Sequence, residues 1–113
     1  MELKYYLVPI TWVQGSITGW GNGYVVLSKE HPLNGVYYDD IDVSVHGGLT
    51  FSEYGKNINS DKYFTKPDFI KDDDWIVGFD TCHWGDNKDN WTEEAVLAET
   101  IRLKEQLERY KAS

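Results

Sequence analysis

The sequence predicts an α+β fold, in which a twisted, mainly antiparallel sheet carries a carboxy-terminal helix on one face. Two patterns lead to this prediction. Several short segments alternate apolar and polar residues, as half-buried strands do, whereas residues 90–110 repeat apolar positions with the period of a helix. The 113 residues contain no internal repeat or linker, so we expect a single domain, residues 1–113.

Strands are expected in residues 5–13, 24–28, 42–52 and 75–80, which are rich in β-branched and aromatic residues. Pro9 favours an edge position for the first strand, because proline has no N–H group to donate to a neighbouring strand. The third segment alternates on both sides of Gly47 and Gly48, and these glycines allow a bend beside His46.

The helix is expected to begin near Asn90 or Thr92, because their side chains can accept hydrogen bonds from the free N–H groups of a first turn. Its apolar stripe is formed by Val96, Leu97, Thr100, Ile101, Leu103, Leu107 and Tyr110. One helix cannot cover both faces of a sheet in a chain that is 15% aromatic. We expect the second face to be covered by the middle of the chain, by a ligand, or by a second subunit in a homo-oligomer.

Residues 53–74 form this middle segment, in which the strand pattern is lost among charged residues and asparagines. Its aromatic residues give it apolar surface to bury, and they are Tyr54, Tyr63, Phe64 and Phe69. Long loops in small domains are usually functional or mobile. The segment is therefore expected to be a lid or a loop.

The charge balance limits the partners of the chain. It has 11 Lys and Arg residues against 19 Asp and Glu residues, a net charge of −8, so duplex nucleic acid and anionic membranes are not expected partners. No apolar run is long enough to span a membrane, and the amino terminus does not resemble a signal peptide. One cysteine, Cys82, allows no disulfide within the chain. These features predict a cytoplasmic protein.

Two segments hold most of the residues suited to chemistry. Residues 43–52 read VSVHGGLTFS, and residues 75–86 read WIVGFDTCHWGD. If they are neighbours in the sheet, four polar side chains meet at one end, namely His46, Asp80, His83 and Asp86. Imidazole and carboxylate groups can act as a general acid and base or bind a divalent metal, and the amides of the two glycines can hold an anion.

The same residues also have structural interpretations. His31 and His46 can bond the backbone in turns, and the aspartates can cap turns. A metal site needs at least three converging ligands, and no known zinc spacing is present, so neither a metal nor a cofactor is expected. Cys82 is more typical of a small buried group than of a nucleophile. The HGGL stretch is similar to an esterase oxyanion loop but lacks the Gly-x-Ser-x-Gly turn that would accompany it.

Three motifs within residues 22–86 resemble those of a family of small uncharacterised proteins of bacteria and their phages. They are HPxxG at residues 31–35, VHGGLTF at residues 45–51 and GFDxxHxGD at residues 78–86. The resemblance implies that the polar residues of the motifs form a site, and it implies no particular activity. The family pattern has Cys-Ala where this chain has Thr81 and Cys82, so the resemblance transfers no role to Cys82.

We expect a small-molecule binding protein. Aromatic rings stack on flat heterocycles and carboxylates accept hydrogen bonds from ribose or base edges, so a nucleotide-derived ligand suits the composition. With the phage resemblance, this predicts a protein that sequesters such a ligand, with Trp84 as part of the pocket. The ligand-binding residues are expected to be His46, Gly47, Gly48, Thr50, Asp80, His83, Trp84 and Asp86. The alternative is a small hydrolase of a phosphorylated or nucleotide-like substrate, either metal-dependent or using His46, Asp80 and His83 as acid and base.

Overall fold

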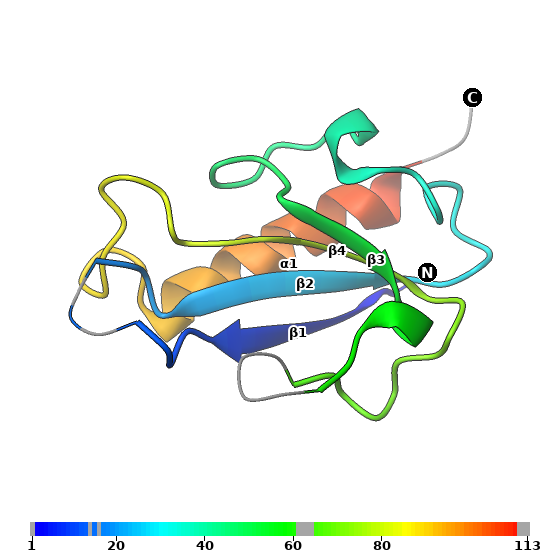
Figure 1. Ribbon diagram of the computed structural model, residues 1–113. Coiled ribbons are helices and arrows are strands. Elements are labelled where there is room, and N and C mark those ends of the chain that lie inside the picture. The colour runs from blue at the N-terminus through cyan, green and yellow to red at the C-terminus, as the bar shows by residue number, and fades with distance from the viewer. Residues whose placement is uncertain (1, 14, 16, 61–64, 111–113) are drawn as a thin grey trace.

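The computed structural model describes residues 2–13, 15, 17–60 and 65–110. A four-stranded sheet packs one face against a helix, α1 (Glu93–Arg109), which lies behind the sheet in Figure 1. The strands are β1 (Lys4–Pro9), β2 (Gly21–Leu27), β3 (Phe51–Tyr54) and β4 (Trp75–Phe79). They pair antiparallel in the order β1-β2-β4-β3, which confirms the predicted α+β fold and places Pro9 on an edge strand. Two 3-10 helices, η1 (Tyr38–Asp40) and η2 (Gly55–Asn57), lie before and after β3.

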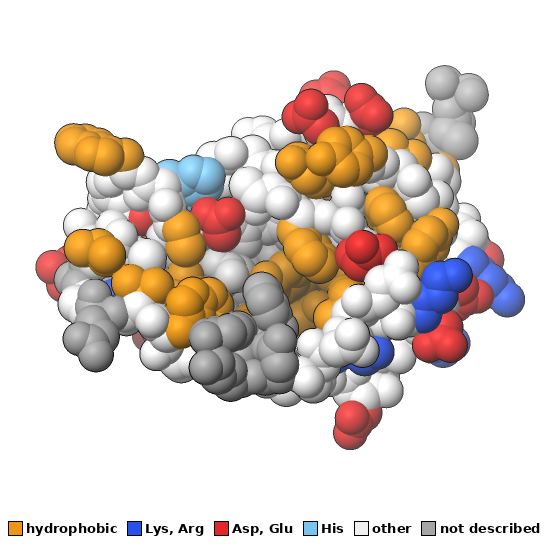
Figure 2. Space-filling model, in the orientation of Figure 1, with side chains coloured by type: hydrophobic (Ala, Val, Ile, Leu, Met, Phe, Trp, Pro, Cys, Tyr) orange, Lys and Arg blue, Asp and Glu red, His pale blue; other side chains and the backbone are white. Residues whose placement is uncertain are grey.

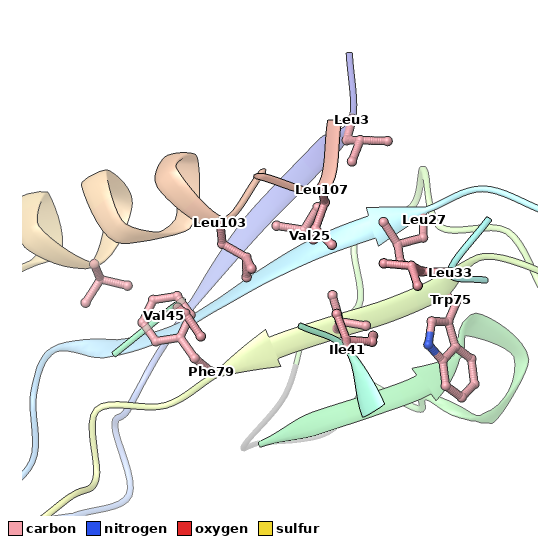
Figure 3. Packing of buried hydrophobic residues seen from close by; sticks show 12 residues of the cluster. Leu3, Val25, Leu27, Leu33, Ile41, Val45, Trp75, Phe79, Leu103 and Leu107 are labelled. Atoms are coloured by element: carbon pink, nitrogen blue, oxygen red, sulfur yellow. The ribbon is translucent and has the colours of Figure 1, made fainter. Parts of the chain in front are cut away.

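The larger core lies between α1 and the sheet (Figure 3). Val25 and Leu27 of β2 and Phe79 of β4 are buried there with Leu103 and Leu107 of the helix. All the residues of β2 are buried, because the strand lies between two neighbours and both its faces are covered. Its odd-numbered residues face the helix, and its even-numbered residues face away from it.

The helix agrees with its prediction at the start but not at the end. Thr92 is the N-cap, and its side chain accepts a hydrogen bond from the N–H group of Ala95 at 3.2 Å. Tyr110, predicted to extend the apolar stripe, follows the last helical residue in an extended conformation and is 40% exposed. The buried part of the stripe comprises Val96, Thr100, Leu103 and Leu107.

His31 holds the last turn of the helix. Its Nδ1 accepts a hydrogen bond from the N–H group of Leu33 at 3.0 Å, so the ring proton is on Nε2. Nε2 donates to the carbonyl oxygen of Leu107 at 2.9 Å, and the side chain is buried. The HPxxG motif therefore contributes to the fold through its histidine.

Residues 42–50, predicted as part of a strand, are not in the sheet, which resumes only with β3. The apolar side chains of this segment still face the core and the polar ones face solvent. Its backbone groups, however, bond to side chains of α1 instead of to a neighbouring strand. Gln106 Oε1 accepts from the N–H group of Ser44, and Gln106 Nε2 donates to the Ser44 carbonyl oxygen, each at 2.8 Å. Glu99 Oε2 accepts from the N–H group of His46 at 2.7 Å. The segment is thus extended along the helix.

The middle segment covers part of the second sheet face. Ile58 and Ile70 pack on the smaller core of this face, which is formed by Val8, Tyr24, Val26 and Ile76. Residues 61–64 of the segment, which include Tyr63 and Phe64, lie outside the described residues.

The middle segment leaves and rejoins the sheet at the Trp75 end of β4, where the N–H group of Gly55 donates to the carbonyl oxygen of Asp74 at 2.9 Å. The GFDxxHxGD motif begins with the last two residues of β4, and its residues 80–86 follow that other end of the strand. Residues 53 and 54 of the segment belong to β3 and residues 55–57 to η2, and the rest of its described part is a loop that covers the sheet rather than that end of it. No helix in the described ranges is long and apolar enough to cross a membrane.

Candidate functional site

Asp86 links the loop that carries the VHGG residues, before β3, to the loop that carries the end of the GFDxxHxGD motif, after β4. Its Oδ1 and Oδ2 each lie 3.0 Å from Nε2 of His46, which comes from the loop before β3. Oδ2 also accepts a hydrogen bond from the N–H group of His83 at 3.0 Å, and the N–H group of Asp86 returns a bond to the His83 carbonyl oxygen at 2.9 Å. The carboxylate is 5% exposed. The expected meeting of His46, His83 and Asp86 is thus present in the structure.

Both the ring and the backbone of His46 are held by contacts with the fold. Its ring lies on that of Trp91, with centroids 4.2 Å apart, and its N–H group is bonded to Glu99 of the helix. The Arg102 guanidinium, together with the amide of His46, holds the pKa of the Glu99 carboxyl below its usual range. Glu99 is therefore an anionic acceptor at neutral pH. These contacts favour the structural interpretation of His46.

His83 is less completely bonded. Its Nε2 lies 3.2 Å from Oδ1 of Asp80, but the two are not aligned for a hydrogen bond, and Nε2 is buried without a hydrogen-bond partner. The ring meets that of His46 edge to face at 5.4 Å. Gly47, at a φ of +69°, lies close against the same ring. A Cβ atom at position 47 would overlap the imidazole ring, so glycine is required there to seat His83.

Replacing Gly47 by alanine is expected to destabilise the protein and displace His83. Gly48→Ala is a matched control, because Gly48 also has a positive φ, +78°, but has open space where a Cβ would lie. Both variants carry the cost of a left-handed alanine, about 1–2 kcal/mol, and only Gly47→Ala adds the collision. Thermal unfolding and the ring proton resonances of His83 measure the two effects. Equal unfolding temperatures and an unmoved His83 in both variants would contradict this packing.

Asn22 lies next to Tyr24 on the sheet face away from the helix, and Tyr24 lies close enough to Asp80 for its charge to raise the pKa of the Tyr24 hydroxyl. The β2–β4 register ends with the pair of Gly23 and Phe79, and Asp80 is the first residue after β4. Asn22 is 6% exposed. Its Nδ2 donates to the hydroxyl oxygen of Tyr24 at 3.5 Å, whereas its Oδ1 has no hydrogen-bond partner.

In the described part of the chain, the buried side-chain polar atoms without a hydrogen-bond partner are Asn22 Oδ1 and His83 Nε2. His83 lies within ion-pairing distance of Asp80, and Asn22 is bonded to Tyr24, which senses the charge of Asp80. A buried polar group without a partner costs about 1–3 kcal/mol, and folded proteins rarely retain one without a reason. We call the group formed by Asn22, Tyr24, Asp80 and His83 the Asp80 site.

Aromatic rings surround the Tyr24 side of this site. Tyr24 stacks on Tyr6 with centroids 5.0 Å apart and meets the edge of Phe51 at 5.5 Å. Burial, and to a smaller extent the charge of Asp80, raise the pKa of Tyr24 to about 12, so its hydroxyl is neutral at physiological pH. Phe51 also lines a shallow hollow of about 220 Å³ with Glu53 and Ile58. Figure 2 shows hydrophobic side chains in the hollowed centre of this face.

Six of the eight expected binding residues lie outside the Asp80 site. His46, Gly47 and Asp86 contact His83, as described above, and the other three are Gly48, Thr50 and Trp84. Trp84, predicted as part of the pocket, is fully exposed to solvent. Thr50 is exposed, and its N–H group donates to the Gly78 carbonyl oxygen at 2.9 Å. The N–H group of Gly48 donates to the Val45 carbonyl oxygen at 2.9 Å. The N–H group of Gly48 is therefore not free to hold an anion, as the sequence had suggested for Gly47 and Gly48.

Asn22 and Tyr24 are absent from the sequence-based site. One signal could have found Asn22, because it is a polar residue on the inward face of an otherwise apolar strand. The sequence alone did not show that its neighbour Tyr24 lies close to Asp80.

Neither metal chemistry nor a thiol nucleophile is supported by the geometry. Among the His, Cys, Asp and Glu residues that the structure describes, no group of three is arranged to hold a metal ion. Cys82, expected to be a small buried group, is exposed because it lies in the loop after β4. Partial desolvation of its thiol, followed by the charges of Asp80 and Asp86, raises the pKa of Cys82, which keeps it in the less reactive protonated form.

Comparisons with protein-family models, with curated proteins and with solved structures find no match for this chain. Its function is therefore inferred from the geometry of the Asp80 site.

Proposed function

We propose that the protein binds a small molecule at the Asp80 site. The observation that carries this proposal is the pair of unpartnered buried atoms, Asn22 Oδ1 and His83 Nε2, in the group of residues around Asp80 and Tyr24. A ligand that bonds Asp80 and these atoms would remove the cost of leaving them unpaired. The aromatic rings of Tyr24 and Phe51 offer it an apolar wall.

A nucleotide-derived ligand, expected from the sequence, suits this site through its base. A flat heterocycle can pack against the aromatic rings, and its amino groups can donate to carboxylate and amide oxygens. The motif resemblance to phage proteins supports a role in sequestering such a molecule in the cytoplasm. Binding without turnover is favoured because the His46–Asp86 pair is already bonded to the surrounding fold.

A hydrolase is the second candidate, and one observation favours it. The two imidazole rings, each beside a carboxylate, meet with centroids 5.4 Å apart. In such a hydrolase, His83, with Asp80 beside it, would exchange a proton with the substrate. His46 is less suited, since its Nε2 is bonded to Asp86.

One experiment separates the two candidates. The purified protein is examined by native mass spectrometry, alone and after incubation with a mixture of nucleotides, and any bound molecule is recovered by denaturation. Recovery of an unchanged ligand supports binding, and recovery of an altered one supports hydrolysis. If neither the isolated nor the incubated protein carries a small molecule, the proposed function is wrong.

Asn22→Leu is expected to stabilise the protein and abolish ligand binding. Leucine has a similar size, so it can fill the space while removing an unpartnered buried acceptor that costs about 1–3 kcal/mol. Chemical denaturation measures the stability, and native mass spectrometry measures the binding. A control is Glu105→Leu, since Glu105 is exposed on α1, on the opposite side of the sheet. Loss of stability in Asn22→Leu would indicate that Asn22 serves the fold instead.

A further inference from the structure

The geometry points to a ligand that presents a positively charged, planar nitrogen group, such as an amidinium, a guanidinium or a protonated amino-heterocycle, to Asp80. This inference rests on the proposed function and names the chemistry of its ligand. It follows from the hydrogen-bonding capacity, the charge and the aromatic surroundings of the site.

The oxygen atoms of the site need donors. Asn22 Nδ2 lies 3.5 Å from the Tyr24 hydroxyl oxygen, and Asn22 Oδ1 is an acceptor without a hydrogen-bond partner. The ionised carboxylate of Asp80 can only accept, and its Oδ1 already takes the N–H group of Cys82 at 3.0 Å. A ligand that bridges these two side chains must therefore carry at least two N–H or O–H donors.

The charge of the site favours a cation. Among the described residues, the only basic group within ion-pairing distance of Asp80 is the imidazole of His83, at 3.2 Å. Figure 2 shows most of the Lys and Arg side chains on this face gathered toward the right, away from the histidine at the upper left. The net charge of −8 adds a general preference for cations over anions. A phosphate or carboxylate group at Asp80 would be repelled.

The aromatic rings favour a planar cation over a compact one. Tyr24 lies between Tyr6 and Phe51, so the wall beside the acceptors is made of π systems. A cation within about 6 Å of such a ring is attracted by its electron-rich face. A flat, delocalised group can lie against a ring while its edge donates parallel hydrogen bonds to a carboxylate.

Three probes of nearly equal shape test the inference. Benzamidine is cationic, benzamide is neutral and benzoate is anionic, and each is titrated into the ¹⁵N-labelled full chain while the backbone and Asn22 side-chain amide resonances are followed. Benzamidine is expected to bind about tenfold more tightly than benzamide, the difference between a charge-assisted and a neutral hydrogen bond. Benzoate is expected to leave the resonances of Asn22, Asp80 and His83 unmoved.

Asp80→Asn is expected to remove the preference, so that benzamidine binds the variant no more tightly than benzamide does. Asp89→Asn is the matched control, because Asp89 is an exposed aspartate in the same connection between β4 and α1. Its preference for benzamidine should equal that of the unmodified protein. The resonance dispersion of each variant shows whether it is folded, and the comparison of the three probes on the unmodified chain stands without either variant.

The possible failures are distinguishable. If benzamide or benzoate binds at these resonances as tightly as benzamidine, or if no probe moves them, the cationic chemistry is wrong. The proposed function survives that result if native mass spectrometry still finds a small molecule that is lost in Asn22→Leu. If no molecule is found there either, both the inference and the proposed function are wrong.

Discussion

Leu107→Ala is expected to lower the free energy of unfolding by about 2–5 kcal/mol, the usual cost of emptying a large side chain from a packed core. Leu107 is 0% exposed and lies in the core between α1 and the sheet. Its carbonyl oxygen also accepts the bond from His31, so a shift of this turn would disturb the loop before η1. Denaturation with urea, followed by circular dichroism, measures the change.

The control for this variant is Leu97→Ala on the same helix. Leu97 is only partly buried, so its truncation should cost distinctly less than that of Leu107. A loss below about 0.5 kcal/mol for Leu107→Ala, the range of surface positions, would show that the helix does not pack on the sheet in solution.

Asp86→Ala is expected to cost about 3 kcal/mol and to loosen both motif loops together. The carboxylate is nearly fully buried and accepts from the imidazole of His46 and the amide of His83. Hydrogen bonds to a charged group contribute about 1.5–3 kcal/mol each, and their loss leaves both donors unpaired. Hydrogen exchange of the amides of residues 44–50 and 80–86 measures the loosening, alongside chemical denaturation.

Two further variants sharpen the test of Asp86. Asp86→Asn keeps one acceptor oxygen without the charge, so it should be destabilised less than Asp86→Ala. Asp89→Ala removes an exposed carboxylate three residues away and should change the stability by less than about 0.5 kcal/mol. Faster exchange in only one of the two loops of Asp86→Ala would contradict the view that Asp86 joins them.

The helix and the sheet could be predicted because their signals are local. Thr92 before two glutamates marks a helix start in any context, and the apolar stripe from Val96 to Leu107 needs only the helical period. Residues 42–50 were predicted as a strand because alternation reports only which side of an extended chain is buried. It does not report the partner of the backbone, which here is Gln106 and Glu99, more than fifty residues away along the chain.

The candidate site could be predicted only in part for a related reason. His46, His83 and Asp86 fall in unusual motifs, so their residue types drew attention before any contact was known. Asn22 is in an ordinary strand, and its importance arises from the approach of its neighbour Tyr24 to Asp80, which no short stretch of sequence encodes. Trp84 shows the opposite error, because a residue type suited to a pocket is placed in solvent by the turn that carries it.

The bond between the N–H group of Leu3 and the carboxylate of Glu108, 2.8 Å long, has a consequence for biosynthesis. The helix that covers the sheet is the last element along the described chain, so a chain still emerging from the ribosome has strands whose apolar face is open to water. The helix can cover that face only after Leu107 has left the exit tunnel. The hydrogen bond between Leu3 and Glu108 can form only then as well. The protein must therefore fold after translation of the helix rather than strand by strand, and nascent chains shorter than this should be the ones that chaperones bind.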